Sequence, residues 1–99
     1  MIIVAGWMEV EADGADAAEA LARTMMAETR KEDGCVIYDI TRSLEHPGRF
    51  HVYEEWQSLP ALEAHFATPH MATFRAGLGA LNVTGRSVAR REGGEPTTL

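Results

Sequence analysis

The chain lacks several features that mark specialised classes of protein. It has one cysteine, Cys35, among its 99 residues, so no disulfide can form within it and a disulfide scaffold is excluded. Charged residues interrupt every apolar stretch, and none approaches the roughly 20 residues that cross a bilayer. A membrane span is therefore excluded. No basic and apolar leader precedes the first strand-like run, which leads us to expect a protein of the reducing cytoplasm.

Positive charge is also scarce: nine Lys and Arg residues stand against fifteen Asp and Glu, which gives a net charge of −6 at neutral pH. Such a chain repels phosphate backbones and anionic lipid unless a basic cluster overrides the mean field. The one cluster is Arg86, Arg90 and Arg91, and no aromatic side chains are interleaved with it. We therefore expect a solvated last strand there and no nucleic-acid partner. No glycine-rich phosphate loop, dinucleotide fingerprint or serine elbow is present, which argues against nucleotide cofactors and triad hydrolysis.

The length supports one hydrophobic core and is too short for two. Hydrophobic residues make up 45% of the chain, which is ordinary for a folded globular protein. We predict a single domain over residues 1–92. Residues 93–99 lack apolar periodicity, and we predict that they form a mobile tail.

The first half of the chain predicts one strand, one helix and a hairpin. Residues 2–11 are almost continuously apolar, which suits a strand buried on both faces. Apolar residues then recur at helical spacing as far as about Asp33, where Gly34 is a good residue to end the helix. Residues 35–42 and 49–56 have strand propensity and lie close together in sequence, which predicts an antiparallel pair.

The second half predicts a broken helix and a last strand. Ser58 can cap a helix that Pro69 ends or kinks, and the helical period restarts from Met71 to Leu78. Residues 81–90 alternate like a strand. The order βαββαβ predicts an α+β, ferredoxin-like fold, in which both helices cover one face of a four-stranded antiparallel sheet.

The other face of this sheet needs a cover of its own. Val36, Tyr38 and Ile40 alternate with Cys35 and Ile37, so both faces of that strand carry apolar side chains. A second sheet from another copy of the chain would cover the free face, and most soluble homo-oligomers are closed dimers. We therefore predict a homodimer formed by sheet-to-sheet packing.

Three segments in the middle of the chain form a recognisable pattern, EDGCVIYDI, PGRFHVYEEW and ALEAHFATPHMATF. The resemblance that they carry is to the antibiotic biosynthesis monooxygenase family and its quinol-monooxygenase relatives. It implies a dimeric α+β barrel and, in each subunit, a pocket lined by the end of the third strand and by the second helix. The residues at the matching positions are Glu54, Trp56, His65, Phe66, His70 and Phe74.

Within this pocket His65 and Glu54 are the candidate catalytic residues, and the other four are candidates for substrate binding. His65 is either a general base, since imidazole titrates near neutrality, or a half-exposed helical histidine with a hydrogen-bonded neighbour. Glu54 is expected to orient His65 or a substrate hydroxyl, or to form an ion pair with Arg75. Trp56 would stack on a planar substrate or belong to the core.

The remaining histidine does not predict a metal site. His70 follows Pro69, so a capping or packing role at a helix N-terminus is expected. His65 and His70 are five residues apart across a proline, which is not the spacing of two ligands on one helical face, and Cys35 has no partner. We therefore expect no metal and no other cofactor.

The function that the resemblance implies is a monooxygenase that needs no cofactor. Its substrate, a small aromatic quinol or anthrone, supplies electrons to dioxygen once a base has formed its anion. One alternative is a haem-binding or haem-degrading relative, but these use an asparagine near the first strand, where this chain has Ala5, Gly6 and Trp7. A non-catalytic dimeric module that binds an aromatic metabolite is a further alternative, since fold does not fix function.

Overall fold

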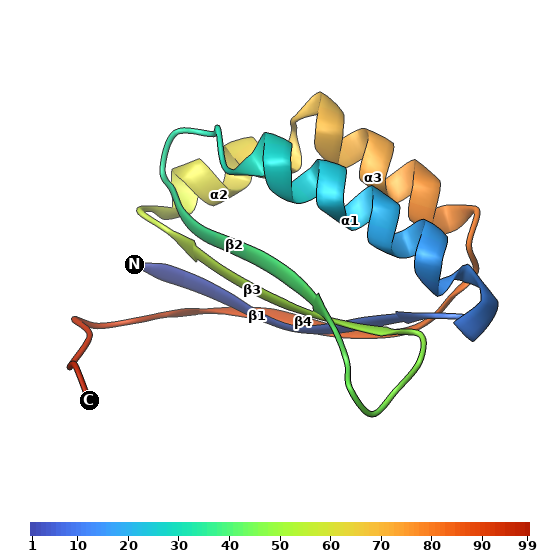
Figure 1. The fold of residues 1–99 in the computed structure, drawn as a ribbon. Helices are drawn as coiled ribbons and strands as arrows, with labels where there is room; N and C mark the ends of the chain where they lie inside the picture. Colours follow the sequence, from blue (N-terminus) through green and yellow to red (C-terminus); the bar gives the residue numbers. More distant parts are fainter.

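The computed structural model describes all 99 residues as a single sheet with helices on one side (Figure 1). Its elements are β1 (Ile2–Val10), a short 3-10 turn η1 (Ala12–Gly14), α1 (Ala15–Thr29), β2 (Cys35–Arg42), β3 (Arg49–Trp56), α2 (Leu59–Phe66), α3 (Pro69–Gly79) and β4 (Val83–Glu92). The strands lie in the order β2-β3-β1-β4, and every neighbouring pair is antiparallel. This confirms the predicted α+β, ferredoxin-like arrangement.

Helix α1 packs its small residues onto the sheet. Ala18, Ala22 and Met25 are fully buried, as expected for the apolar face of an amphipathic helix. The helix ends at Thr29, before the predicted end at Asp33, because the backbone turns there, and Glu32 donates its N–H to the carbonyl of Thr29. This turn moves Glu32 off the helix and toward α2.

Gly34 closes that turn and is required by its geometry. Its φ is +84°, a left-handed conformation that residues with a Cβ adopt at a cost. A Cβ at this position would also lie 2.6 Å from the Cβ of Ala61 in α2. The glycine therefore allows the chain that leads into β2 to pass close to α2.

A proline separates the second helical region into α2 and α3. The two helices have similar starts, because the hydroxyl of Ser58 accepts the N–H of Ala61 and the hydroxyl of Thr68 accepts the N–H of Met71. Pro69 has no N–H and is favoured only in the first turn of a helix. The break changes the direction of the chain between His65 and His70.

One prediction about β2 is wrong. Val36 does not share a face with Tyr38 and Ile40, because a bulge between Cys35 and Ile37 shifts the register with β3. An extra residue in one strand reverses the alternation of side chains on one side of it. Val36 is exposed, whereas Tyr38 and Ile40 are buried beneath the helices.

The last strand starts two residues later than predicted, at Val83, after Asn82 with a φ of +57°.

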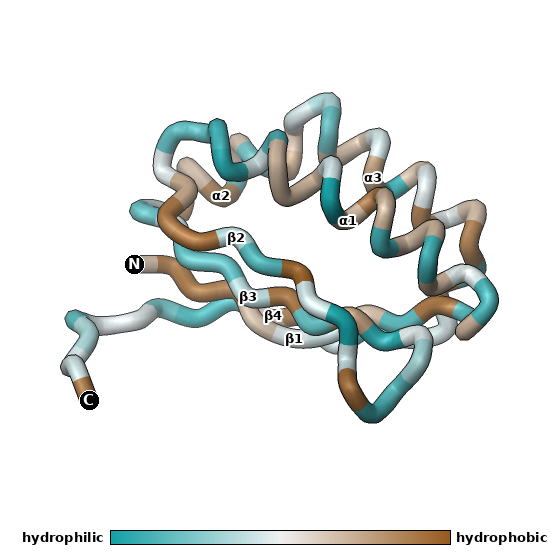
Figure 2. Tube along the Cα trace, viewed as in Figure 1, coloured by the Kyte–Doolittle hydropathy of each residue, from teal (hydrophilic) through white to brown (hydrophobic).

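Hydrophobic residues predominate at the start of β1, whereas the C-terminal end of β4 is hydrophilic (Figure 2). Residues 93–99 form neither helix nor strand, and their mobility remains a prediction. None of the helices is both long enough and apolar enough to span a bilayer.

Candidate functional site

A cavity of about 590 Å³ lies between the sheet and the helices α2 and α3. Most of its lining is apolar, as in typical small-molecule sites. The lining includes four residues of the predicted pocket: Glu54, His65, Phe66 and Phe74. Among the lining residues, Leu62, His65 and Glu54 are buried and Phe66 is exposed, and those on β4 are mostly exposed, so the cavity has a closed end around His65 and opens along β4.

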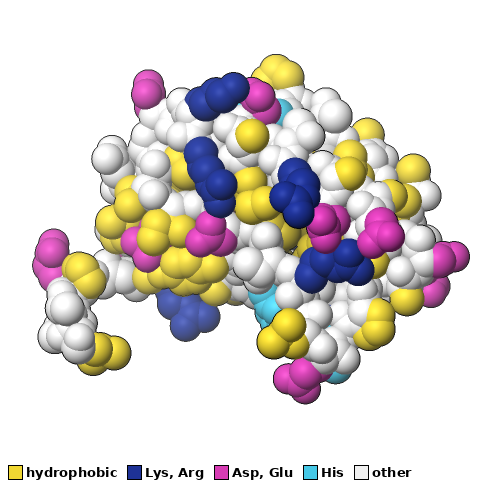
Figure 3. Space-filling view, in the orientation of Figure 1, with side chains coloured by type: hydrophobic (Ala, Val, Ile, Leu, Met, Phe, Trp, Pro, Cys, Tyr) yellow, Lys and Arg dark blue, Asp and Glu magenta, His cyan; other side chains and the backbone are white.

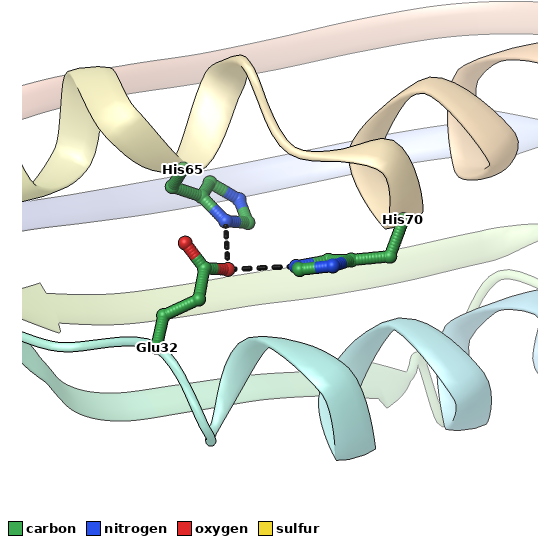
Figure 4. A group of neighbouring side chains, drawn as sticks. All are labelled: Glu32, His65 and His70. Atoms are coloured by element: carbon green, nitrogen blue, oxygen red, sulfur yellow. Dashed lines mark hydrogen bonds and ion pairs between the residues drawn. The ribbon is translucent and has the colours of Figure 1, made fainter.

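His65 lies at the closed end and is held by a carboxylate from the turn after α1. Its side chain is 1% exposed, and its Nδ1 is 2.8 Å from Oε2 of Glu32 (Figure 4). Nε2 is therefore the ring nitrogen left for a ligand in the cavity. A second group that fixes one nitrogen of a histidine sets the tautomer and orientation of the ring.

His70 contacts the same carboxylate from the other side of the helix break. Its Nε2 is 2.7 Å from the same Oε2 atom of Glu32 (Figure 4). An ionised carboxylate only accepts hydrogen bonds, so each histidine donates an N–H to it. This assignment puts the proton of His65 on Nδ1 and leaves Nε2 as an acceptor.

Aromatic rings surround His65. The imidazole centroid is 4.8 Å from the ring of Trp56 and 5.4 Å from that of Tyr38. Burial lowers the pKa of His65, and this effect outweighs the hydrogen bond to Glu32, which raises it. The imidazole is therefore neutral near pH 7, as a general base must be before it takes a proton.

Glu54 lies on β3 in the same cavity and differs from the expectation. Its Oε1 accepts a hydrogen bond of 2.8 Å from Nε1 of Trp56, and it contacts neither His65 nor Arg75. Burial raises the pKa of Glu54 to about 7 despite this hydrogen bond. The side chain is thus a second group that can exchange a proton near neutrality.

Two of the predicted binding residues lie outside the cavity. Trp56 is completely buried and packs beneath His65, so its ring cannot stack on a ligand in the cavity. The expected stacking role was wrong, because a tryptophan that faces the helices at a strand end is covered by them. His70 belongs to the Glu32 cluster and likewise does not line the cavity.

Sequence analysis missed Glu32 and Tyr38. Tyr38 lines the cavity opposite Glu54 on the neighbouring strand, and alternation along residues 35–42 did not show which of the two faces lies under the helices. Glu32 lies 33 residues from His65 in sequence. Its signals were its place two residues before Gly34, where a helix was expected to end, and its position at the start of the segment EDGCVIYDI.

The cluster of Glu32, His65 and His70 is also a set of groups that could hold a metal ion. Each offers one ligand atom, and these atoms lie within 4.8 Å of one another. The spacing argument overlooked this arrangement because it considered only ligands on one continuous helix. The two short contacts to a single oxygen match hydrogen bonds donated by the two imidazole rings.

Comparison with known proteins adds a family and several similar structures. The family model for antibiotic biosynthesis monooxygenases matches residues 1–77. A candidate monooxygenase of Mycobacterium tuberculosis is 38% identical over 69 residues, which cover 70% of this chain and 67% of that protein. An uncharacterized protein of Synechocystis is 33% identical over 73 residues, 74% of this chain, and the chain spans half the length of that relative.

The solved structures agree in fold along the whole chain. A candidate antibiotic biosynthesis monooxygenase from Deinococcus radiodurans has a TM-score of 0.93 and 32% identity, with coverage of 100% of this chain and 98% of the other. The structure of the Mycobacterium tuberculosis relative has a TM-score of 0.86 and 29% identity, with 98% of each chain covered.

Proposed function

The chain belongs to the antibiotic biosynthesis monooxygenase family, and from this premise we propose that it oxidises a small aromatic quinol or anthrone with dioxygen and without a cofactor. The family supports a monooxygenase-like activity in general, and the cavity supports the choice of substrate. It is largely apolar and has aromatic residues in its lining, which suits a planar ring system.

The reaction begins with removal of a proton from the substrate. In this proposal Nε2 of His65 takes the phenolic or enolic proton, and the resulting anion transfers electrons to dioxygen. Glu32 contacts the opposite nitrogen, where a carboxylate stabilises the imidazolium as it forms. Glu54 lines the same cavity and orients a substrate hydroxyl.

The observation that carries the proposal is the pairing of His65 with Glu32. The alternative, a half-exposed histidine hydrogen-bonded to a neighbour, agrees with the contact to Glu32 but not with the exposure, since this side chain is 1% exposed and lines the cavity. A base, a carboxylate that orients it and a largely apolar pocket are parts that formation of a substrate anion needs.

Oxygen uptake with a panel of quinols and anthrones tests this assignment. General-base assistance is worth about 10²- to 10⁴-fold in rate, so His65→Ala should lose activity within that range while circular dichroism remains unchanged. His46→Ala is the matched control, because His46 is exposed in the loop between β2 and β3. A folded His65→Ala protein with the original rate would rule out His65 as the base.

The same experiment separates the enzyme from a non-catalytic binding module. Such a module would bind the quinol, detected anaerobically by calorimetry, without oxygen uptake above the spontaneous rate. Visible absorption of the purified protein tests the haem-binding alternative, and elemental analysis tests for a metal at the Glu32 cluster.

We also propose that two copies pair through the sheet face that no helix covers. Register places Ala5, Tyr53 and Ala89 in one row on that face, with Ile3 and Trp7 beside them on β1. Tyr53 is 39% exposed in the single chain, and a second sheet would bury it. Light scattering should give the mass of a dimer, and Ala5→Arg should shift it to a monomer. Ala64→Arg on the exposed side of α2 should not.

A further inference from the structure

The basic side chains of this acidic protein divide into two groups. The chain has nine Lys and Arg residues against fifteen Asp and Glu. Five of the nine lie within 4.0 Å of a carboxylate, namely Arg23, Arg30, Lys31, Arg42 and Arg49. The other four form no salt bridge, although carboxylates outnumber bases.

The paired group lies on α1, the turn after it and the sheet. Figure 3 shows the face that carries α1 and β2, where Lys and Arg side chains lie among Asp and Glu side chains. On the uncovered sheet face Arg49 contacts Glu9 at 2.8 Å and lies over the ring of Trp7 at 3.8 Å. These cations are already neutralised within the chain.

Three of the four arginines without a salt bridge, Arg75, Arg86 and Arg90, line the cavity. Arg75 comes from α3, and its Nη1 reaches the carbonyl of Phe66 at 3.4 Å across the break between the helices. Arg86 and Arg90 come from β4. The fourth, Arg91, is opposite Ile3 on the other face of the sheet. The open side of the apolar cavity therefore has two positive charges, Arg86 and Arg90, and no carboxylate is paired with either, whereas Arg75 lies beside α2, close enough to His65 to act on its charge.

The positive side and the base lie at opposite ends of the cavity. Register places Glu54, Val4 and Arg90 in one row across β3, β1 and β4. Glu54 and Arg90 are thus two strand spacings apart, roughly 10 Å between Cα atoms. Apolar lining from Val4, Val88 and Phe74 lies between the two ends, which gives room for fused rings.

We infer that the preferred substrate is an acidic aromatic compound, with its reactive hydroxyl at His65 and a carboxylate at Arg86 and Arg90. This inference rests on the proposed function for the hydroxyl end and deepens it by naming the charge of the substrate. A guanidinium binds a carboxylate through charge-assisted hydrogen bonds, often two at once. The positive charges also favour the anion that forms when His65 removes the proton.

Binding of a matched pair of ligands tests the inference without turnover. The probes are 6-hydroxy-2-naphthoate, whose hydroxyl and carboxylate lie at opposite ends of two fused rings, and its neutral amide, 6-hydroxy-2-naphthamide, titrated anaerobically into the full chain by calorimetry. We expect the carboxylate to bind at least about tenfold more tightly than the amide, and the preference to weaken as salt is added. Equal affinities, or no detectable binding of the carboxylate at millimolar concentration, would overturn the inference.

Substitutions of single arginines show which residues cause the preference for the carboxylate. Arg86→Gln and Arg90→Gln should each reduce the preference for the carboxylate several-fold and leave the amide affinity unchanged. Arg91→Gln is the control, because it removes the same charge from the same strand on the opposite face. An equal loss in Arg91→Gln would mean that the general field of the protein is responsible, which would overturn the assignment of these two arginines.

The outcomes are distinct from those that test the proposed function. If the carboxylate is preferred but no quinol is oxidised, the monooxygenase assignment fails and the acidic-ligand site stands. If His65→Ala loses oxygen uptake but the two probes bind equally, only this inference fails. It also fails if Arg86→Gln and Arg90→Gln convert a dimer to a monomer while the original protein has no preference, since the arginines would then be subunit contacts.

Discussion

The two ends of the cavity differ in how completely their polar groups are paired. At the closed end, Glu32 accepts from both His65 and His70, and Glu54 accepts from Trp56. At the open side, Arg86 and Arg90 are exposed and have no carboxylate partner. The closed end is therefore assembled by folding alone, whereas the charges of the open side are left for something that binds there.

Because of this difference, the two regions contribute differently to stability and to binding. Buried hydrogen-bonded groups fix one geometry and destabilise the fold when a partner is removed. Exposed unpaired charges contribute little to stability and act instead on ligands and partners. Substitutions at the closed end should therefore change the free energy of unfolding, and substitutions at the open side should change binding.

The largest effect is expected from Trp56→Ala. Trp56 is fully buried, and truncating a buried tryptophan costs about 3 to 5 kcal/mol. The change also leaves Glu54 without its hydrogen-bond donor. Urea unfolding should show this loss, and Phe66→Ala should show much less, because Phe66 is 46% exposed in the same cavity. Similar losses for both would contradict the contrast between buried and open positions.

A pH-dependent effect of intermediate size is expected from Glu54. Its pKa rises from an unfolded value of about 4.3 to about 7 in the fold because the carboxyl is buried. Between these pH values the folded protein keeps a proton that the unfolded chain has lost. The contribution of Glu54 to the free energy of unfolding is therefore full below about pH 4 and declines by about 3 kcal/mol as the pH rises to 7.

Glu54→Gln should remove this decline, since an amide does not titrate and can still accept from Trp56. Denaturant unfolding at several pH values between 4 and 8 measures it. Glu55→Gln is the control on the opposite face of the same strand, and its profile should follow that of the original protein. A Glu54→Gln profile with the original slope would mean that burial does not hold the proton on Glu54.

A smaller loss is expected from Glu32→Gln. The amide can still accept a hydrogen bond, but the charge that two histidines share is gone, which should cost about 1 to 3 kcal/mol. The pKa of His65 should also fall further, because Glu32 raises it in the native protein. Histidine titration by NMR checks the second effect. Glu28→Gln on α1, which pairs with Lys31 near the surface, should change neither quantity appreciably.

Much of this fold could be predicted from the sequence, because β2 and β3 begin and end at the predicted residues 35–42 and 49–56. The bulge at Val36 could not, since alternation of apolar residues contains no signal for one extra residue. Pro69 indicated a break in the second helix, but periodicity does not give the direction in which the chain continues.

The site was only partly predictable for a related reason. His65, Glu54, Phe66 and Phe74 line the cavity as the family resemblance implied. The pairing of His65 with Glu32 depends on where α1 ends and on how closely the turn at Gly34 approaches α2. Both are tertiary facts, and no spacing along the chain contains them. Trp56 was assigned to the ligand because it matches a pocket-lining position of the family, and that match does not show what covers the ring in this chain.

The smallest effect on stability is expected at the open side. Arg86→Gln and Arg90→Gln should each change the free energy of unfolding by less than about 0.5 kcal/mol, because surface substitutions away from caps, cores and paired charges usually stay within that range. Arg42→Gln is the informative comparison, since Arg42 contacts both Asp16 and Glu19 at 2.9 and 3.1 Å and links β2 to α1. It should cost somewhat more, although exposed ion pairs contribute little to stability. Thermal unfolding of the three variants ranks them by stability.

If Arg86→Gln or Arg90→Gln destabilised the protein more than Arg42→Gln did, the arginines of β4 would be structural. The division between a closed end assembled by folding and an open side that serves binding would then not hold.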